Sequence, residues 1–572
     1  MALCEKVSNL FPKEVDLVVV GSGAAGLAAA VTAAVAGQKV IVLEKTNKIG
    51  GTTSYSEAMI WVPCSEQARQ AGIADSVENA LDYLRSVIGN KLDIVQAEAY
   101  LKAAPQMLTF FERHTALRYA LATGSIDYYS DREGATSGAR ALCAGSFDGR
   151  KLGRRDFKLL RQPLRVAQLF GGMTIAATDL QHFYRVFRSV RSTLRVTQLI
   201  ARYTFDRVTG WPRGTAIANG DGVIAGLLFT LREKGGEIKT NAEVTQLSFD
   251  DRRVTGVTVL NNGIEQHIKA RRGVVLASGG FSANGELRCK YKGIDQAKDN
   301  HVILVAEGAT GDGMRLAENV GGVISDALVQ PMAWAPTSWV PHLGSAFPHF
   351  VERAKPGVIA VDSKGRRFTN EAAVYHDFVP AMINNANGSD RVEAWLIADH
   401  VAQRRYGLGA APPAPGFLGP SIRSGYLQVA PSLRELAEKI GVDGVTLEES
   451  VGRFNTDAKQ GLDTQFARGQ SEQNRAYGDP DHGPNPCLGA LQTAPFYAVN
   501  IQPGDLGSLV GLSIDARSRV LDKDKQPIIG LYAAGLDAAS MFGGHYPAAG
   551  VTVGSALTFG WIAARDALGL AG

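Results

Sequence analysis

The sequence lacks the cysteine patterns that hold metal ions, iron–sulfur clusters or haem. Five cysteines are scattered over 572 residues, and no two of them form a C-x-x-C pair. An odd number at wide spacing favours free thiols in a reducing compartment. We therefore expect no metal site and a cytoplasmic location.

A large charge excess and long apolar runs are also missing. A net charge of +4 is small for this length and gives no indication of nucleic-acid binding. The first ten residues have no apolar core of a secretory signal, and no membrane span is predicted. With 45% hydrophobic and 20% charged residues, the composition is that of a soluble globular protein, and the length predicts at least two domains.

Residues 15–45 form the most informative stretch that is present. A strand V-D-L-V-V-V leads into the turn G-S-G-A-A-G, a helix of small residues and a second strand K-V-I-V-L-E-K. Gly21, Gly23 and Gly26 have the spacing that allows a tight turn, close approach to a pyrophosphate and close helix packing. Glu44 ends the second strand, where a carboxylate can accept both hydroxyls of an adenosine ribose. This unit predicts dinucleotide binding; the alternative is a Gly/Ala-rich helix packed in an ordinary α/β core.

A second glycine-rich turn follows this unit. Gly50, Gly51, Thr52 and Thr53 offer backbone amides and hydroxyls that suit a diphosphate or the edge of a flavin. The alternative is a plain Gly/Thr loop.

The pattern of strands and helices predicts a discontinuous first domain. Residues 215–280 and the C-terminal segment both have α/β character, whereas residues 286–495 are rich in proline, aromatic residues and loops. We predict an α/β protein with a Rossmann-like dinucleotide-binding domain, residues 1–285 and 496–572. An α+β substrate domain, residues 286–495, is inserted into it.

Residues 151–213 are strongly basic, with thirteen Lys or Arg and three Asp. Arg185, Arg188, Arg191 and Arg195 recur every three or four residues with apolar residues between them. The spacing predicts a basic amphipathic helix that could lie on an anionic membrane surface. A solvated face or an interface with a partner subunit is the alternative.

Two adjacent tyrosines, Tyr128 and Tyr129, lie in a polar loop over residues 126–140. Tyrosines in such loops are commonly half-buried anchors, and a catalytic role is the alternative.

Six motifs in order carry a family resemblance. V-V-V-G-S-G-A-A-G, G-G-T-T-S, V-L-A-S-G-G-F, A-T-G-D-G-M, G-R-R-F-T-N-E and G-L-Y-A-A-G span nearly the whole chain. Together they resemble the FAD-containing fumarate reductase/succinate dehydrogenase flavoprotein superfamily. P-F-Y-A-V-N-I-Q-P-G-D-L-G and H-Y-P-A-A-G-V-T-V-G look like its 3-ketosteroid Δ1-dehydrogenase branch.

The resemblance implies FAD as the cofactor, and no second glycine fingerprint suggests a nicotinamide. The candidate cofactor-binding residues are those of the glycine motifs and of the segments that the resemblance places beside FAD. They are Gly21, Gly23, Ala24, Ala25, Gly26, Glu44, Lys45, Gly50, Gly51, Thr52, Thr53, Ser54, Ala277, Ser278, Gly279, Asp312, Gly535, Thr552 and Val553.

A contrast within the superfamily bears on the chemistry. The fumarate reductases follow the N-E pair with an arginine that delivers a proton, whereas N-E-A-A-V is followed here by Tyr375. The C-terminal arginine motif is replaced by H-Y-P-A-A-G. A site for a dicarboxylate without its guanidinium groups would leave buried carboxylates unpaired, so dicarboxylate reduction is disfavoured.

The resemblance also assigns catalytic roles. Tyr375 matches the proton-abstracting tyrosine of the ketosteroid dehydrogenases, and Tyr128 matches its supporting tyrosine, with Tyr129 as a close competitor. Tyr546 and the backbone N–H of Gly550 match the pair that binds the carbonyl oxygen. A phenol with a pKa near 10 is mostly protonated at neutral pH, so Tyr375 needs a second hydroxyl or a positive field. Two histidines, His376 and His545, flank these tyrosines and are candidates to tune them.

The sequence therefore predicts an FAD-dependent 3-oxosteroid Δ1-dehydrogenase that passes electrons to an external acceptor, a quinone or similar compound. The alternatives are a dehydrogenase of a smaller, cyclohexanone-like ketone and a 3-oxosteroid 4-ene (5α) dehydrogenase. A reductase of an unsaturated acid and a flavin-binding protein without catalysis are further from the pattern. The departure G-S-L-V-G at residues 507–511 leaves room for a substrate smaller than a steroid.

Overall fold

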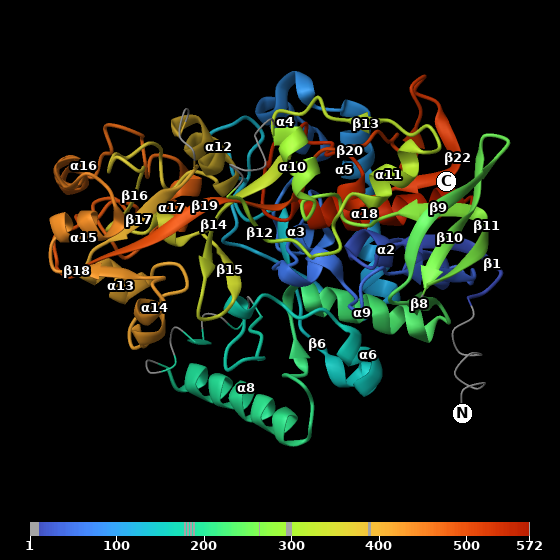
Figure 1. The fold of residues 1–572 in the computed structure, drawn as a ribbon, viewed down its shortest axis with the longest axis horizontal. Coiled ribbons are helices and arrows are strands. Elements are labelled where there is room, and N and C mark those ends of the chain that lie inside the picture. The colour runs from blue at the N-terminus through green and yellow to red at the C-terminus, as the bar shows by residue number, and fades with distance from the viewer. Residues whose placement is uncertain are drawn as a thin grey trace.

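The computed structural model describes residues 11–176, 179, 182–183, 186, 189–261, 263–292, 300–386 and 391–570. Two sheets dominate it, and Figure 1 shows them on opposite sides of the molecule. The first contains the blue, green and red strands at the right, and the second contains the yellow and orange strands at the left.

The first sheet is built around β1 (Glu14–Val20), which pairs in parallel with β2 and with β11. β22 comes from the C-terminal segment and pairs in parallel with β11, so the two ends of the chain complete one sheet. β1 and β2 are nearly continuous buried runs of Val, Ile and Leu, as expected for strands covered on both faces. The other strands of this sheet are β2 (Val40–Leu43), β8 (Glu237–Lys239), β9 (Glu243–Asp250), β10 (Arg253–Asn261), β11 (Ile264–Leu276), β21 (Arg519–Leu521) and β22 (Pro527–Ala533).

Small residues let helices pack closely beside this sheet. α2 (Ala24–Val35) packs against α9 (Asn219–Glu233) and α18 (Val551–Ala567). A Cβ at Gly560 would lie 2.3 Å from the carbonyl oxygen of Ala25, so α18 can approach α2 only because this position is glycine. α18 also packs on α5 (Ile94–His114), which contacts α4 (Val77–Ile88). These contacts confirm the predicted Rossmann-like architecture.

The second sheet has the central order β15-β14-β19-β17-β16. Its strands are β12 (Val302–Ile303), β14 (Met332–Val340), β15 (Ser345–Pro348), β16 (Val358–Val361), β17 (Ala394–Ala398), β18 (Gln428–Ala430) and β19 (Phe496–Ser508). The helices of this part are α12 (Tyr375–Asn385), α13 (His400–Tyr406), α14 (Gly419–Arg423), α15 (Leu433–Ile440), α16 (Gly444–Gln460) and α17 (Glu472–Tyr477). β19 follows the predicted boundary at residue 495 and pairs within this sheet. The division into residues 1–285, 286–495 and 496–572 stays a prediction.

The remaining elements surround these two layers. They are β3 (Ile60–Trp61), β4 (Tyr119–Leu121), β5 (Ala141–Ala144), β6 (Phe147–Asp148), β7 (Ala216–Ile217), β13 (Ile324–Ser325), β20 (Gly511–Leu512), α3 (Glu66–Gln70), α6 (Gly153–Leu159), α8 (Val190–Val208), α10 (Gly285–Lys292) and α11 (Asp312–Glu318). Short 3₁₀ turns connect several of them, of which η1 (Gly51–Tyr55) matters for the site.

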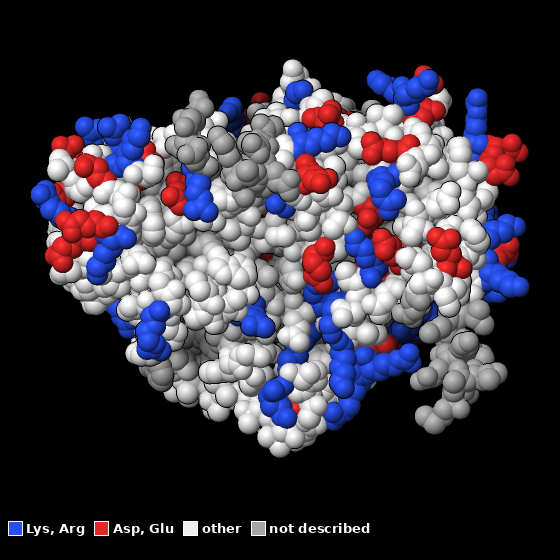
Figure 2. Space-filling model, in the orientation of Figure 1, with Lys and Arg blue, Asp and Glu red and all other residues white. Residues whose placement is uncertain are grey.

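The basic segment contains the long helix α8, which begins at Val190. Arg185 and Arg188, two of the four arginines that predicted an amphipathic helix, lie outside the described residues. Figure 2 shows Lys and Arg side chains gathered at the lower edge of the molecule, near α6 and the end of α8 in Figure 1. Within the described ranges, no helix is both long and apolar enough to cross a membrane, and no cluster of side chains suits a metal ion.

Candidate active site

A cavity of about 860 Å³ extends from the carboxyl ends of β1 and β2 to the second sheet, where Pro348 of β15 and Leu506 of β19 line it. Most of the predicted cofactor-binding residues line it. They are Gly21, Gly23, Ala24, Ala25, Glu44, Lys45, Gly51, Thr52, Thr53, Ala277, Ser278, Gly279, Asp312, Gly535, Thr552 and Val553. Gly26, Gly50 and Ser54 are buried behind this lining.

Glu44 marks one end of the cavity, which we call the adenosine end. One of its carboxylate oxygens accepts from the Ser22 hydroxyl at 2.6 Å, and the other accepts from the Thr46 hydroxyl at 2.8 Å. These bonds hold the carboxylate in place while it lines the cavity. Lys45 pairs with Asp312 in the same part of the cavity wall.

The two glycine turns lie side by side and form a cradle for a diphosphate. At Gly21 φ is +102°, and a Cβ there would lie 2.2 Å from the Ala277 carbonyl oxygen, so both the turn and the close approach require glycine. The Ala24 backbone N–H, in the first turn of α2, donates to Thr53 Oγ1 at 3.1 Å. A Cβ at Gly51 would be in contact with Gly23 at 3.7 Å. This junction at the start of a helix suits anionic phosphates, and the residues present fit FAD.

Asp537, which was not predicted from the sequence, binds the glycine-rich segment of residues 278–280 through hydrogen bonds. Its buried carboxylate accepts from the Ser278 hydroxyl and from the Gly280 backbone N–H, both at 2.9 Å. Burial raises the pKa of this carboxyl, and the hydrogen bonds partly offset that effect. The acid comes two residues after the G-L-Y-A-A-G motif, but nothing in the spacing indicates that it bonds residues 278–280.

Three tyrosines from distant parts of the chain meet at the other end of the cavity. The Tyr128 hydroxyl donates to the Tyr375 hydroxyl at 3.1 Å. The ring centroids of Tyr375 and Tyr546 are 5.6 Å apart, and those of Tyr128 and Tyr546 are 6.3 Å apart. All three line the cavity together with Tyr477 and Phe350. We call this part the tyrosine end.

Local structure positions each of these tyrosines. Tyr375 is the first residue of α12, and the Tyr128 backbone N–H donates to the Pro547 carbonyl oxygen at 2.9 Å. Tyr546 shares a hydrogen bond of 3.1 Å with Thr552 Oγ1, and Thr552 is the second residue of α18. The Tyr128 loop is therefore tied to the segment that carries Tyr546.

Gly550 lines the cavity four residues after Tyr546. Its φ is +87°, and a Cβ there would lie 2.6 Å from the Ile60 backbone nitrogen. Glycine is thus required both by the left-handed conformation and by the adjacent chain. The position caps the start of α18, where N–H groups have no intrahelical partner.

Tyr129 does not belong to the tyrosine end. Its hydroxyl donates to Asp377 Oδ1 at 2.9 Å, and it is not among the residues that line the cavity. The structure thus brings Tyr128, rather than its neighbour, next to Tyr375.

The two flanking histidines differ in their surroundings. His376 Nε2 donates to the Gly544 carbonyl oxygen at 3.0 Å, and Nδ1 accepts from the Trp334 backbone N–H at 3.2 Å. Burial lowers the pKa of His376 to about 4, so the ring is neutral and bridges two backbone segments. Burial also lowers the pKa of His545, which is not part of the cavity lining.

Burial raises the pKa of the Tyr375, Tyr128 and Tyr546 phenols above the ordinary value. For Tyr375 the raised pKa is due first to burial and then to Tyr546, whereas the hydrogen bond from Tyr128 acts in the opposite direction. All three phenols are therefore protonated at neutral pH. Tyr375 can therefore remove a proton from a substrate only in its ionised form, which the hydrogen bond from Tyr128 favours.

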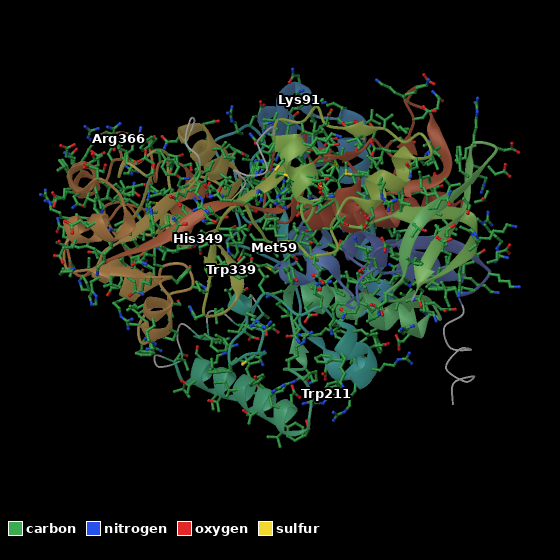
Figure 3. The ribbon with its side chains drawn as sticks, viewed as in Figure 1. Met59, Lys91, Trp211, Trp339, His349 and Arg366 are labelled. Atoms are coloured by element: carbon green, nitrogen blue, oxygen red, sulfur yellow. The ribbon has the colours of Figure 1, made fainter. Side chains whose placement is uncertain are left out.

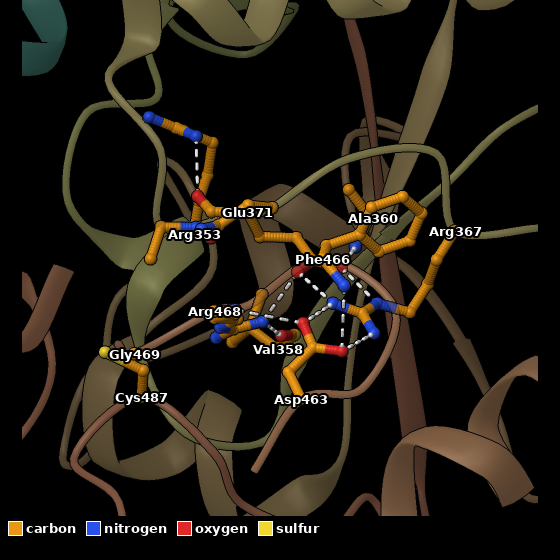
Figure 4. A network of polar contacts seen from close by, with 12 residues as sticks. Arg353, Val358, Ala360, Arg367, Glu371, Asp463, Phe466, Arg468, Gly469 and Cys487 are labelled. Carbon is orange, nitrogen blue, oxygen red and sulfur yellow. Dashed lines mark hydrogen bonds and ion pairs between the residues drawn. The ribbon is translucent and has the colours of Figure 1, made fainter. Parts of the chain in front are cut away.

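A buried ionic network fixes the loop that precedes Tyr375 (Figure 4). Arg367 pairs with Glu371 at 2.7 Å and with Asp463 at 2.9 Å, and Arg468 also contacts Glu371, at 3.1 Å. Burial alone would raise the pKa of Glu371, but the two guanidinium groups lower it overall. The carboxylate thus remains ionised four residues before the tyrosine.

Arg353 adds a direct link between this network and the tyrosine end. It donates to the carbonyl oxygens of Glu371 at 2.7 Å and of Ala373 at 3.2 Å. A further bond of 3.3 Å goes to the carbonyl oxygen of Phe350, whose ring centroid is 4.7 Å from that of Tyr375. The loop-rich sequence around Tyr477 and Phe350 carries no signal that would have placed them here.

Comparisons with known proteins identify the class. Residues 16–553 match the FAD binding domain family. The chain is 38% identical over 561 residues to 4-oxocyclohex-2-ene-1-carboxylate 5-dehydrogenase of Sinomonas cyclohexanicum, covering 97% of this chain and 94% of that one. It is 36% identical to 3-oxosteroid 1-dehydrogenase of Mycolicibacterium smegmatis, covering 97% of each.

A solved structure agrees with these relatives. The 3-ketosteroid Δ1-dehydrogenase from Sterolibacterium denitrificans, in complex with 1,4-androstadiene-3,17-dione, superimposes with a TM-score of 0.89. It is 34% identical, and the alignment covers 98% of this chain and all of that one. Fold and site thus define an FAD-dependent oxidoreductase. The chain belongs to the FAD binding domain family, in the branch that contains the 3-oxosteroid 1-dehydrogenases.

Proposed function

We propose that this protein is an FAD-dependent 3-oxosteroid 1-dehydrogenase, which removes hydrogen from adjacent carbons beside a ring ketone. The cluster of Tyr128, Tyr375 and Tyr546 at the end of the FAD-binding cavity is the observation that carries this proposal. When bound in this cavity, FAD would supply the acceptor for the hydride of the β-carbon. The assignment agrees with relatives that cover nearly the whole chain.

The tyrosines have complementary roles in this proposal. Tyr375 takes the α-proton in its ionised form, and Tyr128, whose hydroxyl is 3.1 Å away, donates a hydrogen bond that stabilises this phenolate before the transfer. Tyr546 and the Gly550 N–H hold the carbonyl oxygen while the enolate forms. One such donor contributes about 3–4 kcal/mol to stabilisation of the transition state, which offsets the raised pKa of the buried phenol.

The charges that line the cavity favour a neutral ketone. Among the described lining residues the cations are Lys45 and Arg161, and both lie at the adenosine end. Lys45 is paired with Asp312, and Arg161 is paired with Glu307 and bonded to the Thr46 hydroxyl. Neither is available to a carboxylate at the tyrosine end. A reductase of an unsaturated acid would need a cation there.

A dehydrogenase of a smaller cyclic ketone is the second candidate. The relative at 38% identity, whose name places its substrate among cyclohexenone carboxylates, favours it. Oxidation of the 4,5 bond of a 3-oxosteroid is the third candidate.

The test is a panel of ketones added to the holoenzyme under argon. Androst-4-ene-3,17-dione, 5α-androstane-3,17-dione and cyclohexanone are compared by loss of flavin absorbance, and products are identified by mass and proton spectra. The proposal predicts fast bleaching by the first compound and a 1,4-diene product. Bleaching by cyclohexanone alone, or a product unsaturated only at the 4,5 bond, would replace it with the second or third candidate.

An external electron acceptor completes the proposed cycle. A quinone or a similar compound would reoxidise the flavin, and the class of acceptor is tested by turnover with a soluble quinone compared with air. Faster reoxidation by dioxygen than by any quinone would contradict this part of the proposal.

Peripheral membrane contact through residues 151–213 is also proposed, and the surface of α8 supports it. Val190, Leu194, Phe205 and Val208 are each more than half exposed. At 100° per residue they fall within about 60° of one another, on a single stripe. Arg191 and Arg202 lie on the same flank of this stripe. An apolar stripe beside cations is typical of helices that lie on anionic membranes.

Flotation with vesicles tests this contact. The double variant Leu194→Ser, Phe205→Ser is expected to lose binding to vesicles that contain phosphatidylglycerol. The matched control, Ile264→Ser with Phe417→Ser, removes two exposed apolar side chains elsewhere and should bind as before. Equal flotation of both variants, or no flotation of the wild type, would refute the contact.

A further inference from the structure

Glu57 contributes to the cavity wall a carboxyl group that has no hydrogen-bond or ion-pair partner among the described residues. The residue lines the cavity and is exposed to it, although it lies deep inside the protein. Within the described part of the chain, its carboxyl group has no hydrogen bond or ion pair. Burial raises its pKa, and no cation offsets the effect.

The neighbours of Glu57 locate it toward the tyrosine end. Its charge acts on Tyr477 and on Cys143, both of which line the cavity. Met59, two residues on, also lines the cavity and lies at the centre of the molecule between the two sheets (Figure 3). Met59 packs directly against Gly550, where a Cβ would lie 2.6 Å from the Met59 carbonyl carbon.

The backbone holds this segment in a fixed conformation. The Ser56 carbonyl oxygen accepts from the Gly220 backbone N–H at 2.9 Å, and the Ser56 hydroxyl donates to the Thr53 carbonyl oxygen at 2.7 Å. Ala58 has φ +53°, a left-handed conformation that is uncommon for residues other than glycine. Glu57 is thus fixed on both sides and cannot easily leave the cavity wall.

We propose that Glu57 is a specificity-determining residue that makes the tyrosine end reject anionic ketones and admit neutral ones. When Glu57 is ionised, a substrate carboxylate would lie beside a second negative charge unless it brought a proton with it. Either outcome costs free energy inside the protein, and the cations among the described lining residues are engaged at the adenosine end. This inference rests on the proposed oxidation of ketones and goes further, since it names the charge class of the substrate.

The test compares two substrates that differ in charge, 4-oxocyclohexane-1-carboxylate and its methyl ester. Rates of flavin bleaching under argon and dissociation constants from the shift of the oxidised flavin spectrum are measured for each holoenzyme. The variants are Glu57→Gln, which removes the charge at nearly constant shape, and Glu57→Asp, which keeps it. Glu243→Gln is the control, because this carboxyl lines the adenosine end beside residues that bond Glu44.

Wild type and Glu57→Asp should prefer the ester. Glu57→Gln should move the ratio of the two dissociation constants toward the carboxylate by at least about tenfold, and Glu243→Gln should leave this ratio unchanged. An unchanged ratio in Glu57→Gln, or a wild-type preference for the carboxylate, overturns the proposal. Since binding is read without turnover, a lack of bleaching by these two compounds still leaves Glu57 decided by the dissociation constants, whereas the proposed function fails only if androst-4-ene-3,17-dione also does not bleach the flavin.

Discussion

Replacing Tyr128 and Tyr129 by phenylalanine, one at a time, separates a catalytic hydroxyl from an anchoring one. The two residues are adjacent in the sequence, yet one hydroxyl is 3.1 Å from Tyr375 and the other is 2.9 Å from Asp377. Both variants remove one oxygen and keep the ring. Any difference in rate or stability between the two variants is therefore due to the different contacts of the two hydroxyls.

The structure sets the expected magnitudes. A hydrogen bond to a group that becomes charged contributes about 1.5–3 kcal/mol. Tyr128→Phe should thus slow flavin reduction by about 10- to 150-fold, with a small loss of stability because the buried ring still packs. Tyr129→Phe should change the rate by less than about threefold. It should lower the free energy of unfolding by about 1 kcal/mol or less, since Asp377 loses a donor but is exposed.

Stopped-flow absorbance with androst-4-ene-3,17-dione under argon measures the rates, and thermal unfolding of the holoenzymes measures stability. Flavin content of each variant is the control for intact binding. Equal rates for the two variants, or a larger rate loss in Tyr129→Phe, would refute the assignment of Tyr128.

Two further predictions follow from the same geometry. Gly550→Ala should lower the rate of flavin reduction by about 100-fold. A Cβ at this position would lie 2.6 Å from the Ile60 nitrogen and must displace the Gly550 amide, which is assigned to bind the carbonyl oxygen of the substrate. An unchanged rate with an unchanged melting temperature would count against this role of the amide. His376, whose folded-state pKa is about 4 against an ordinary value of 6.5, contributes stability that is lost as pH falls below 6.5, because the unfolded chain binds the proton first. Between pH 6.5 and 5 this loss of stability is roughly 1.5 kcal/mol. The free energy of unfolding of His376→Gln should therefore depend less steeply on pH than that of the wild type. Parallel plots of the free energy of unfolding against pH would contradict a buried, neutral His376.

The glycine motif could be predicted from the sequence because a tight turn is determined by a few neighbouring residues. The positive φ of Gly21 belongs to the turn and depends on a few adjacent residues, although the backbone that approaches it, at Ala277, is distant in the sequence. Hydrophobic runs likewise indicate the buried strands β1 and β2. FAD and the roles of the three tyrosines were predicted from the family resemblance.

Contacts between residues that are distant in the sequence could not be predicted from local patterns. Tyr129 stayed a close competitor of Tyr128 because the direction of a loop side chain depends on what the loop contacts, here Pro547 and Asp377. Tyr477 reaches the cavity from the end of α17, in a segment whose sequence gave no periodic pattern. Glu57 was missed for a related reason, since an acid after a glycine-rich turn is ordinarily solvated. Only the fold encloses it.

The central claim, that Tyr375 takes the α-proton of a ring ketone, is tested most directly by single-turnover reduction of the Tyr375→Phe holoenzyme. This account predicts that the variant binds FAD and perturbs the flavin spectrum with androst-4-ene-3,17-dione as the wild type does. Its flavin should bleach at least about 1,000-fold more slowly, which corresponds to about 4 kcal/mol of barrier. Bleaching at close to the wild-type rate would contradict the claim.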